Sequence, residues 1–309
     1  MERKILVTGG AGFIGSHLTA RLTAAGDRVT VLDDLSTGNP TAVPDQARFV
    51  NGDIRDHEIL NGLIADSDLV FHLAAQISVQ DCITQWETSH HVNLGGTMAI
   101  LRAAWRAGNV PVIYASSAAV YGDRDGICRE SDMPQPMSPY AADKLGGEHQ
   151  ARAMAMVYGL PSVGLRFFNV YGPGQNARSP YAGVIARLCA NRRAGDPHIF
   201  YGDGLQSRDF IHVADVANAL ICAADRMADI GGVAPVFNIC TGTATSLFDL
   251  AGMIDRLTDA PPLPIRHVAP RAGDIRHSIG DPTNAEEVLG FRAGNTLPDP
   301  LGELLKATG

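Results

Sequence analysis

The chain has 309 residues, of which 45% are hydrophobic and 19% are charged. A sequence of this length and composition can bury the core of one large α/β domain together with a smaller one. The formal net charge is −8 and lysine and arginine are scattered, which argues against nucleic acid or an anionic membrane surface as a partner.

The five cysteines, Cys82, Cys128, Cys189, Cys222 and Cys240, show neither a pairing pattern nor metal-ligand spacing. This usage is typical of a reducing compartment rather than of a disulfide framework. No apolar run approaches the roughly 20 residues of a membrane span. We therefore expect a cytoplasmic protein with packing cysteines, no membrane partner and no metal site.

Short apolar runs alternate with longer amphipathic stretches through the first half of the chain. This alternation is the pattern of βαβ units, so it predicts an α/β fold with a doubly wound parallel sheet of the Rossmann type. Strands are predicted at residues 4–7, 29–33, 48–52, 69–74, 110–115 and 162–168, and helices at 15–25, 91–107 and 140–158.

The amino-acid composition changes after residue 169, where glycine, proline and asparagine become frequent. A further helix is predicted near residues 183–193. We expect a first, Rossmann domain at residues 1–169 and a smaller C-terminal substrate-binding domain built mainly from residues 170–309. Segment 236–240 reads as a buried strand, so parts of residues 208–240 are expected to return to the main sheet.

Three glycines, Gly9, Gly12 and Gly15, separate the first predicted strand from the first predicted helix. Their GxxGxxG spacing suits a tight turn through which the backbone approaches a pyrophosphate, and the helix N-terminus attracts that negative charge. A glycine-rich turn without a ligand is the alternative. The order of strand, glycine loop and helix favours a dinucleotide site.

The second predicted strand ends in two carboxylates, Asp33 and Asp34. An acidic residue about 20 residues after the glycine motif reaches the ribose hydroxyls of a dinucleotide and repels a 2′-phosphate. The expected cofactor is therefore NAD rather than NADP. Asp33 is the expected contact, and Asp34 is expected to cap a turn.

Tyr140 and Lys144 stand four residues apart at the start of a predicted helix, so their side chains share one face. A cation beside a phenol favours the phenolate, which can then act as a base near neutral pH, and the positive charge of an oxidised nicotinamide acts in the same direction. Without further context this pair is more often a solvated helix face.

The context is supplied by Ser116 and Ser117, which end the preceding predicted strand. Ligands bind at the carboxyl edge of open α/β sheets, so a serine hydroxyl there can share a substrate proton with Tyr140. The alternative is that both serines only terminate the strand.

A series of short motifs accompanies these residues along essentially the whole chain. They are TGGAGFIGSHL, LDDLSTG, GDIRD, HLAA, VNLGGT, SSAAVYG, PYAADK, RFFNVYGP, SRDFIHV and RAGDIRHS. Together they resemble the extended short-chain dehydrogenases/reductases of the NAD-dependent sugar epimerase/dehydratase type.

The resemblance implies a set of cofactor contacts, in which Asp53 and Ile54 flank the adenine, an alanine-rich segment lines the groove and Asn93 supports that segment. The implied cofactor residues are Gly9, Gly12, Phe13, Ile14, Gly15, Asp33, Asp53, Ile54, Leu73, Ala74, Ala75, Asn93, Tyr140 and Lys144.

It further implies a Ser117, Tyr140 and Lys144 catalytic set and a nucleotide-sugar site. Asn169 is expected to contact the nucleotide sugar, Arg208 and Arg271 its diphosphate, and Asp274 its uridine ribose. These arginines would give a protein of net charge −8 the local positive charge that an anionic ligand needs.

Ala118 and Ala119 bear on the choice of reaction. Related 4,6-dehydratases carry an Asp-Glu pair directly after the catalytic Ser/Thr, and methyl groups cannot transfer the protons of a dehydration. No added carboxylate like that of the related decarboxylases is evident in SSAAVYG. The favoured activity is therefore 4-epimerisation of a UDP-hexose with NAD. UDP-glucuronate 4-epimerisation, decarboxylation and dehydration are the alternatives.

Ser278 bears on the choice of sugar. By the resemblance it stands where a bulky tyrosine in some relatives excludes N-acetylated sugars and a small residue admits them. Serine is small, which predicts that UDP-GlcNAc and UDP-GalNAc are accepted along with UDP-Glc and UDP-Gal.

Two other classes of function stay open: a binding module that keeps the fold but not catalysis, and a dehydrogenase that releases NADH. The resemblance also implies a homodimer in which helices near residues 91–107 and 140–158 pair into a four-helix bundle.

Overall fold

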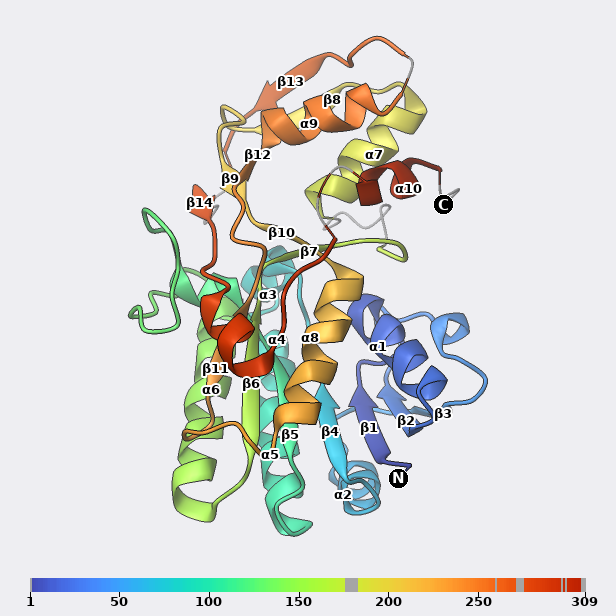
Figure 1. Ribbon diagram of the computed structural model, residues 1–309, viewed down its shortest axis with the longest axis vertical. Helices are drawn as coiled ribbons and strands as arrows, with labels where there is room; N and C mark the ends of the chain where they lie inside the picture. Colours follow the sequence, from blue (N-terminus) through green and yellow to red (C-terminus); the bar gives the residue numbers. More distant parts are fainter. Residues whose placement is uncertain are drawn as a thin grey trace.

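The chain folds into a large lobe built on a parallel sheet and a small lobe above it (Figure 1). The computed structural model describes residues 2–175, 183–258, 260–270, 275–295, 297 and 299–306. The large lobe has a seven-stranded sheet in the order β11-β6-β5-β4-β1-β2-β3, which confirms the predicted doubly wound α/β fold. Its strands are β1 (Lys4–Thr8), β2 (Arg28–Asp33), β3 (Arg48–Asn51), β4 (Leu69–His72), β5 (Val112–Ser117), β6 (Ser162–Phe167) and β11 (Val236–Ile239).

Helices cover both faces of this sheet because successive strand residues point to opposite sides. In β1, Ile5 and Val7 join one hydrophobic cluster while Leu6 between them joins the other. The first cluster lies under α1 (Phe13–Ala24), α8 (Val213–Arg226) and the π-helical turn Ala285–Leu289. The second lies under α2 (His57–Ala65), α5 (Gly96–Arg106) and α6 (Pro139–Tyr158).

The small lobe has its own hydrophobic cluster, formed around Leu188, Phe200 and Leu250. It is joined to the large lobe by β7 (Asn169–Tyr171) and β10 (Phe210–His212), which pair in parallel. Its other elements are α7 (Val184–Ala194), β8 (His198–Tyr201), β9 (Ser207–Arg208), β12 (Thr245–Ser246), α9 (Leu247–Arg256), β13 (Ile265–Val268), β14 (His277–Ser278) and α10 (Asp299–Lys306).

The second half of the chain passes repeatedly between the lobes. After β10 the chain returns to the large lobe, where α8 packs beside α1, and β11 then joins the sheet next to β6 (Figure 1). Residues 208–240 thus contain one helix, α8, and one strand, β11, of the large lobe. Helices α2 and α8 are absent from the elements predicted above, and their residues lie between the predicted strands.

The largest differences from the predicted elements lie next to the functional motifs. The strand expected at 110–115 is shifted and ends at Ser117. The helix expected at 91–107 begins with a π-helical turn at His91–Gly95 and continues as α5, and two short helices, α3 (Val79–Thr84) and α4 (Trp86–His90), precede it. π-Helical turns are frequent at functional sites, and this one carries the predicted site residue Asn93.

Helix α6 has sharp boundaries that fix the position of its first turn. The Ser138 side chain accepts a hydrogen bond from the Ala141 amide at 3.2 Å, and Pro139 occupies the first helical position. At the other end Gly159 adopts the left-handed conformation (φ 70°) that commonly ends a helix.

A buried ion pair joins α6 to the sheet. The Glu148 carboxylate accepts hydrogen bonds from Arg166 Nε at 2.8 Å and Nη2 at 2.6 Å, and also from Ser116 Oγ at 2.5 Å. Arg166 Nη1 donates in turn to Tyr121 Oη at 2.8 Å. A buried charge is tolerated only where such partners replace water, so this network fixes α6 against β5 and β6.

We predict that Arg166→Met lowers the free energy of unfolding by about 3–5 kcal/mol, because it leaves the Glu148 carboxylate buried without its cation. The double variant Glu148→Gln/Arg166→Met should recover part of this loss. Urea denaturation measures both. Lys4→Met, which removes an exposed pair with Asp66, is the control and should have a much smaller effect. A loss from Arg166→Met no larger than that of the control would contradict the role given to the pair.

Candidate functional site

The turn between β1 and α1 is built to let another backbone come close. Gly9 has φ 72°, and a Cβ on it would lie 2.6 Å from the Ala74 amide nitrogen. A Cβ on Gly15 would collide with the Gly9 carbonyl oxygen. Gly12 is the N-cap of α1 and offers no side-chain cap, so the first-turn amides, including those of Phe13 and Ile14, face an open helix end. This arrangement suits a pyrophosphate.

Asp33 ends β2 beside this turn, and its carboxylate is buried. It accepts hydrogen bonds from the Ala11 amide at 3.0 Å and the Leu35 amide at 2.9 Å. The carboxylate is thereby fixed between the glycine turn and the loop after β2, where the ribose of a dinucleotide lies in this fold. Asp34 instead accepts from Ser36 N and Oγ, as expected for a turn cap.

Asp53 and Ile54 follow β3 and differ in exposure. The Asp53 carboxylate pairs with the Arg55 guanidinium, whose hydrogen bonds lower the pKa of Asp53. The Ile54 side chain is buried against Gly96. Any contact of Ile54 with an adenine must therefore come from its main chain.

The segment after β4 lies directly against the glycine turn. The Leu73 amide donates to the Thr8 carbonyl at 3.0 Å, and Ala74 packs on Gly9. Ala75 follows, half-buried. The segment is held from behind by Asn93, which accepts from the Gln76 amide at 2.8 Å and donates to the Gln76 carbonyl at 3.1 Å. Asn93 is thus placed to support this wall of the groove.

Ser117, Tyr140 and Lys144 meet at the carboxyl end of β5. The Ser117 hydroxyl lies near enough to the Tyr140 phenol to lower its pKa, and Lys144 Nζ lies 5.8 Å from the centroid of the Tyr140 ring. Lys144 Nζ also donates to the Ala115 carbonyl at 2.9 Å. Because Tyr140, Lys144 and Glu148 recur every four residues along α6, the buried ion pair holds the same helix stripe that carries the phenol and the ammonium.

Burial has the largest effect on the acidities of this pair. It raises the pKa of Tyr140 to about 12, although the hydrogen bond with Ser117 acts in the opposite direction. It lowers the pKa of Lys144 to about 8, opposed by the nearby Asp143 carboxylate. A further positive charge beside the phenol would favour the phenolate.

Three of the residues expected to bind substrate come together where the two lobes meet. Ser117 is the register partner of Phe167, and Asn169 follows two residues later on the neighbouring chain segment. Arg208 on β9 and Ser278 on β14 are also register partners. Asn169, Arg208 and Ser278 thus lie on the small-lobe side of the catalytic set. Arg271 and Asp274 lie outside the described residues.

Several neighbouring polar residues have structural roles. Ser116 Oγ donates to the Glu148 carboxylate and belongs to the buried ion-pair network. Tyr121 and Tyr171, each within a VYG motif, are almost fully buried packing residues. His212 caps α8, while His72 lies between Thr8 Oγ1 and Thr97 Oγ1 at 2.9 and 3.1 Å. Burial lowers the pKa of His72 to about 3, so it is neutral.

Features of other site types are missing from the part of the chain that the structure describes. No group of three or more histidine, cysteine, aspartate or glutamate side chains among these residues could hold a metal ion. No helix formed by the same residues is long and apolar enough to cross a membrane. The five cysteines are free thiols, and Cys222 is the one that is not fully buried.

Sequence reasoning missed two groups, the Glu148–Arg166 pair and Asp209. Asp209 is fully buried between Asn169, Arg208 and Ser278 in the same region. The SRDFIHV motif contained the signal, an acidic residue directly before the apolar strand residues Phe210 and Ile211, which is expected to be buried with hydrogen-bond partners.

Known proteins resemble the chain over nearly its full length. The UDP-glucose 4-epimerase of Mycolicibacterium smegmatis is 38% identical over 98% of this chain and 97% of its own length. The structure of the UDP-N-acetylglucosamine 4-epimerase of Methanobrevibacter ruminantium in complex with UDP-N-acetylmuramic acid matches with 32% identity and a TM-score of 0.92, covering 99% of this chain and 97% of that one. MoeE5 in complex with UDP-glucuronic acid and NAD matches with 37% identity and a TM-score of 0.87, covering 98% of each chain.

The family model described as the NAD dependent epimerase/dehydratase family matches residues 5–240. That range contains the glycine turn, Asp33 and the Ser117, Tyr140 and Lys144 set. The chain belongs to the NAD dependent epimerase/dehydratase family.

Proposed function

We propose that this protein is an NAD-dependent UDP-hexose 4-epimerase, which interconverts UDP-Glc with UDP-Gal and also UDP-GlcNAc with UDP-GalNAc. The observation that carries the proposal is the convergence of Ser117, Tyr140 and Lys144 beside a turn that only glycine can form. The 38% identity to a UDP-glucose 4-epimerase over 98% of the chain supports the same activity.

The residues of the β1–α1 turn fit NAD. A Cβ at Gly9 or Gly15 would collide with neighbouring backbone and prevent the tight turn that leads into the N-terminus of α1, and the Asp33 carboxylate suits ribose hydroxyls but not a 2′-phosphate. When bound, NAD supplies the redox chemistry by accepting the hydride of C4 and giving it back.

The chain's own residues move the proton and hold the sugar. Tyr140 takes the proton of the C4 hydroxyl, Ser117 shares that proton through its hydrogen bond to Tyr140, and Lys144 supplies positive charge beside the phenol. The resulting 4-keto sugar rotates within the site, so that its other face receives the hydride. Asn169 and Arg208 on the small-lobe side suit the anionic nucleotide part.

Dehydration is the less favoured reaction because two alanines come directly after Ser117. Ala118 and Ala119 form the first turn of a short 3₁₀ helix, which is capped by the Ser117 side chain. Neither methyl group can serve as the additional acid or base that loss of water requires.

The proposal is tested by incubating the purified protein separately with UDP-Gal, UDP-GalNAc and UDP-GalA, resolving each mixture for its C4 epimer and following NADH absorbance. We expect C4 epimers of the first two without NADH build-up and without added NAD, which should co-purify. Absence of any epimer from a preparation that holds NAD would overturn the proposal. Steady NADH release would favour a dehydrogenase instead.

A UDP-glucuronate 4-epimerase is the second candidate. It is favoured by the 37% identity to MoeE5, whose structure is a complex with UDP-glucuronic acid and NAD. Epimerisation of UDP-GalA alone in the same assay would select this candidate.

We predict that Ser117→Ala moves the acid limb of the pH profile of kcat/KM to higher pH. The hydrogen bond with Ser117 lowers the pKa of Tyr140, so its removal raises that pKa and leaves less phenolate at a given pH. The variant should therefore lose most activity at low pH and regain part of it as the pH rises. Tyr140→Phe, the control, should lose about 10²–10⁴-fold at every pH. An unshifted limb in Ser117→Ala would exclude this role for the hydroxyl.

A second prediction concerns the sugar. Ser278 is buried, and it is the register partner of Arg208 in the pairing of β14 with β9. A tyrosine side chain at this position must therefore enter space that is filled by neighbouring residues or needed by the substrate. Ser278→Tyr should lower kcat/KM for UDP-GalNAc by about 10–100-fold, the effect of a steric clash of about 1–3 kcal/mol, and that for UDP-Gal much less. Ser278→Ala should keep both activities. Equal losses on both sugars in Ser278→Tyr would remove Ser278 as the selectivity residue.

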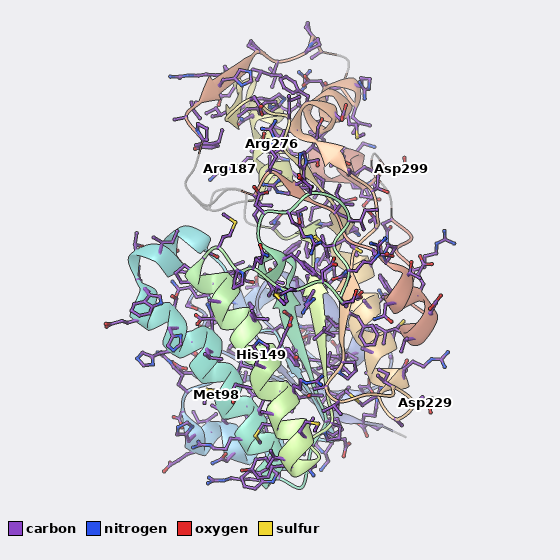
Figure 2. All side chains as sticks on the ribbon, turned by 90° about the vertical axis from the view of Figure 1, so that its left-hand side faces the viewer. Met98, His149, Arg187, Asp229, Arg276 and Asp299 are labelled. Atoms are coloured by element: carbon purple, nitrogen blue, oxygen red, sulfur yellow. The ribbon has the colours of Figure 1, made fainter. Side chains whose placement is uncertain are left out.

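We further propose a cytoplasmic homodimer formed through α5 and α6. These helices lie side by side on one surface of the large lobe, and Figure 2 shows Met98 and His149 on the side that faces the viewer. Met98 is 46% exposed and Met156 64% exposed on this surface, which supports burial against a second copy. The free cysteines are in keeping with a reducing compartment.

Residues 1–169 are proposed as the NAD-binding domain, and residues 170–309 mainly as the nucleotide-sugar-binding domain.

Met98→Glu is predicted to shift the protein from dimer to monomer at micromolar concentration, because the charge would be buried at the interface. Sedimentation velocity measures this. Met133→Glu, at a 79% exposed position in the loop between β5 and α6, should leave the dimer intact. A Met98→Glu protein that sediments as wild type would contradict the proposed interface.

A further inference from the structure

Asp209 lies where the chain passes between the two lobes. It stands between β9 and β10, and its side chain has no exposed surface. Four chain segments meet around it: residues 168–171, 207–212, 239–242 and 278–281. In Figure 1 these segments, which include β7, β10 and the end of β14, lie where the two lobes join.

The carboxylate of Asp209 ties two of the other segments to its own. Oδ1 accepts hydrogen bonds from Thr241 N at 2.9 Å and Thr241 Oγ1 at 2.7 Å. Oδ2 accepts from Gly242 N at 2.9 Å and from Gly280 N at 3.3 Å. One side chain therefore fixes the exit from β11 and the exit from β14.

The main chain of Asp209 holds residues of the proposed substrate site. Its amide donates to the Ser278 carbonyl at 2.8 Å. Its carbonyl accepts from Asn169 N at 3.0 Å and from Asn169 Nδ2 at 3.3 Å. Arg208 is its direct neighbour in sequence. All three residues assigned to the nucleotide sugar in the described part of the chain are thus positioned through Asp209.

The surrounding backbone is shaped to permit this convergence. A Cβ on Gly280 would lie 2.5 Å from Cys240 Sγ, and Gly242 has φ 75°. Burial raises the pKa of Asp209, while the donors from Thr241, Gly242 and Gly280 act in the opposite direction. The carboxylate is therefore held by dipoles that replace its hydration.

We propose that Asp209 is a positioning residue that fixes the small lobe, with Asn169, Arg208 and Ser278, relative to Ser117 and Tyr140, and so retains the 4-keto sugar until hydride returns to it. This inference rests on the proposed 4-epimerase function. It assigns Asp209 no contact with the reacting atoms.

The chemistry of the reaction explains why such a residue is needed. A sugar that must present both faces in turn cannot be held by a rigid set of contacts to its ring. Retention must come from the nucleotide end, which the small lobe contacts. If the lobes are held loosely, the keto sugar can leave after C4 has given its hydride to NAD and its hydroxyl proton to Tyr140, and NADH then stays behind on the enzyme.

Asp209→Asn tests the proposal in the full-length protein with its co-purified cofactor. Asparagine keeps the shape but has one acceptor oxygen, and its NH2 group would face amide donors. We expect the affinity for UDP, measured by calorimetry, to fall about 10–100-fold, since one or two buried donors lose their acceptor. We also expect KM to rise more than kcat falls, and NADH left per epimer formed to increase several-fold. Thr241→Val, which removes only the hydroxyl donor, should change the same quantities in the same direction but less.

Asp255→Asn is the matched control. Asp255 is a buried aspartate inside the small lobe, where it accepts from Arg192 Nη1 and Leu263 N at 3.2 Å each. The Asp255→Asn variant should have a lower melting temperature but should leave no more NADH per epimer formed than wild type does. If wild type forms epimers but Asp209→Asn matches Asp255→Asn in UDP affinity and NADH left per epimer, Asp209 is merely structural and the inference is wrong. If wild type forms no epimer while UDP affinity still drops in Asp209→Asn alone, the proposed reaction fails but the positioning of the nucleotide site stands.

Discussion

The parallel register of the central sheet is the constraint on which the site depends. Because all seven strands point the same way, their carboxyl ends meet at one edge, and most residues of the proposed cofactor and catalytic sites follow or end a strand or lie in the first turns of a helix. The Gly9 turn follows β1, Asp33 ends β2, the Leu73 segment follows β4 and Ser117 ends β5. Segments far apart in sequence therefore reach one edge of the sheet.

Burial at this edge has opposite effects on the two members of the catalytic pair. It disfavours the charged form of each, so it raises the pKa of Tyr140 and lowers that of Lys144. Each further positive charge beside the phenol would favour the phenolate, because a nearby cation stabilises the charged form.

Local signals account for the features that could be predicted from the sequence. The period of the apolar residues predicted the strands, the glycine spacing predicted the first turn, and the four-residue spacing placed Tyr140 and Lys144 on one face of α6. The parts that could not be predicted depend on distant partners. Arg166 is 18 residues from Glu148, and Gly280 is 71 residues from Asp209. Nothing within a single element marks such a pairing.

Glu148 and Asp209 are both buried acids, but they are neutralised in different ways, and the difference suits their positions. Glu148 is paired with a full positive charge, Arg166, at the inner side of the helix that carries the base. Asp209 is satisfied by neutral donors from two other segments. The charge of a buried carboxylate can be neutralised by one cation on one element, whereas neutral hydrogen-bond donors must come from several segments. Asp209 therefore requires those segments to lie together. We expect a site that holds the nucleotide while the sugar rotates to depend on this arrangement.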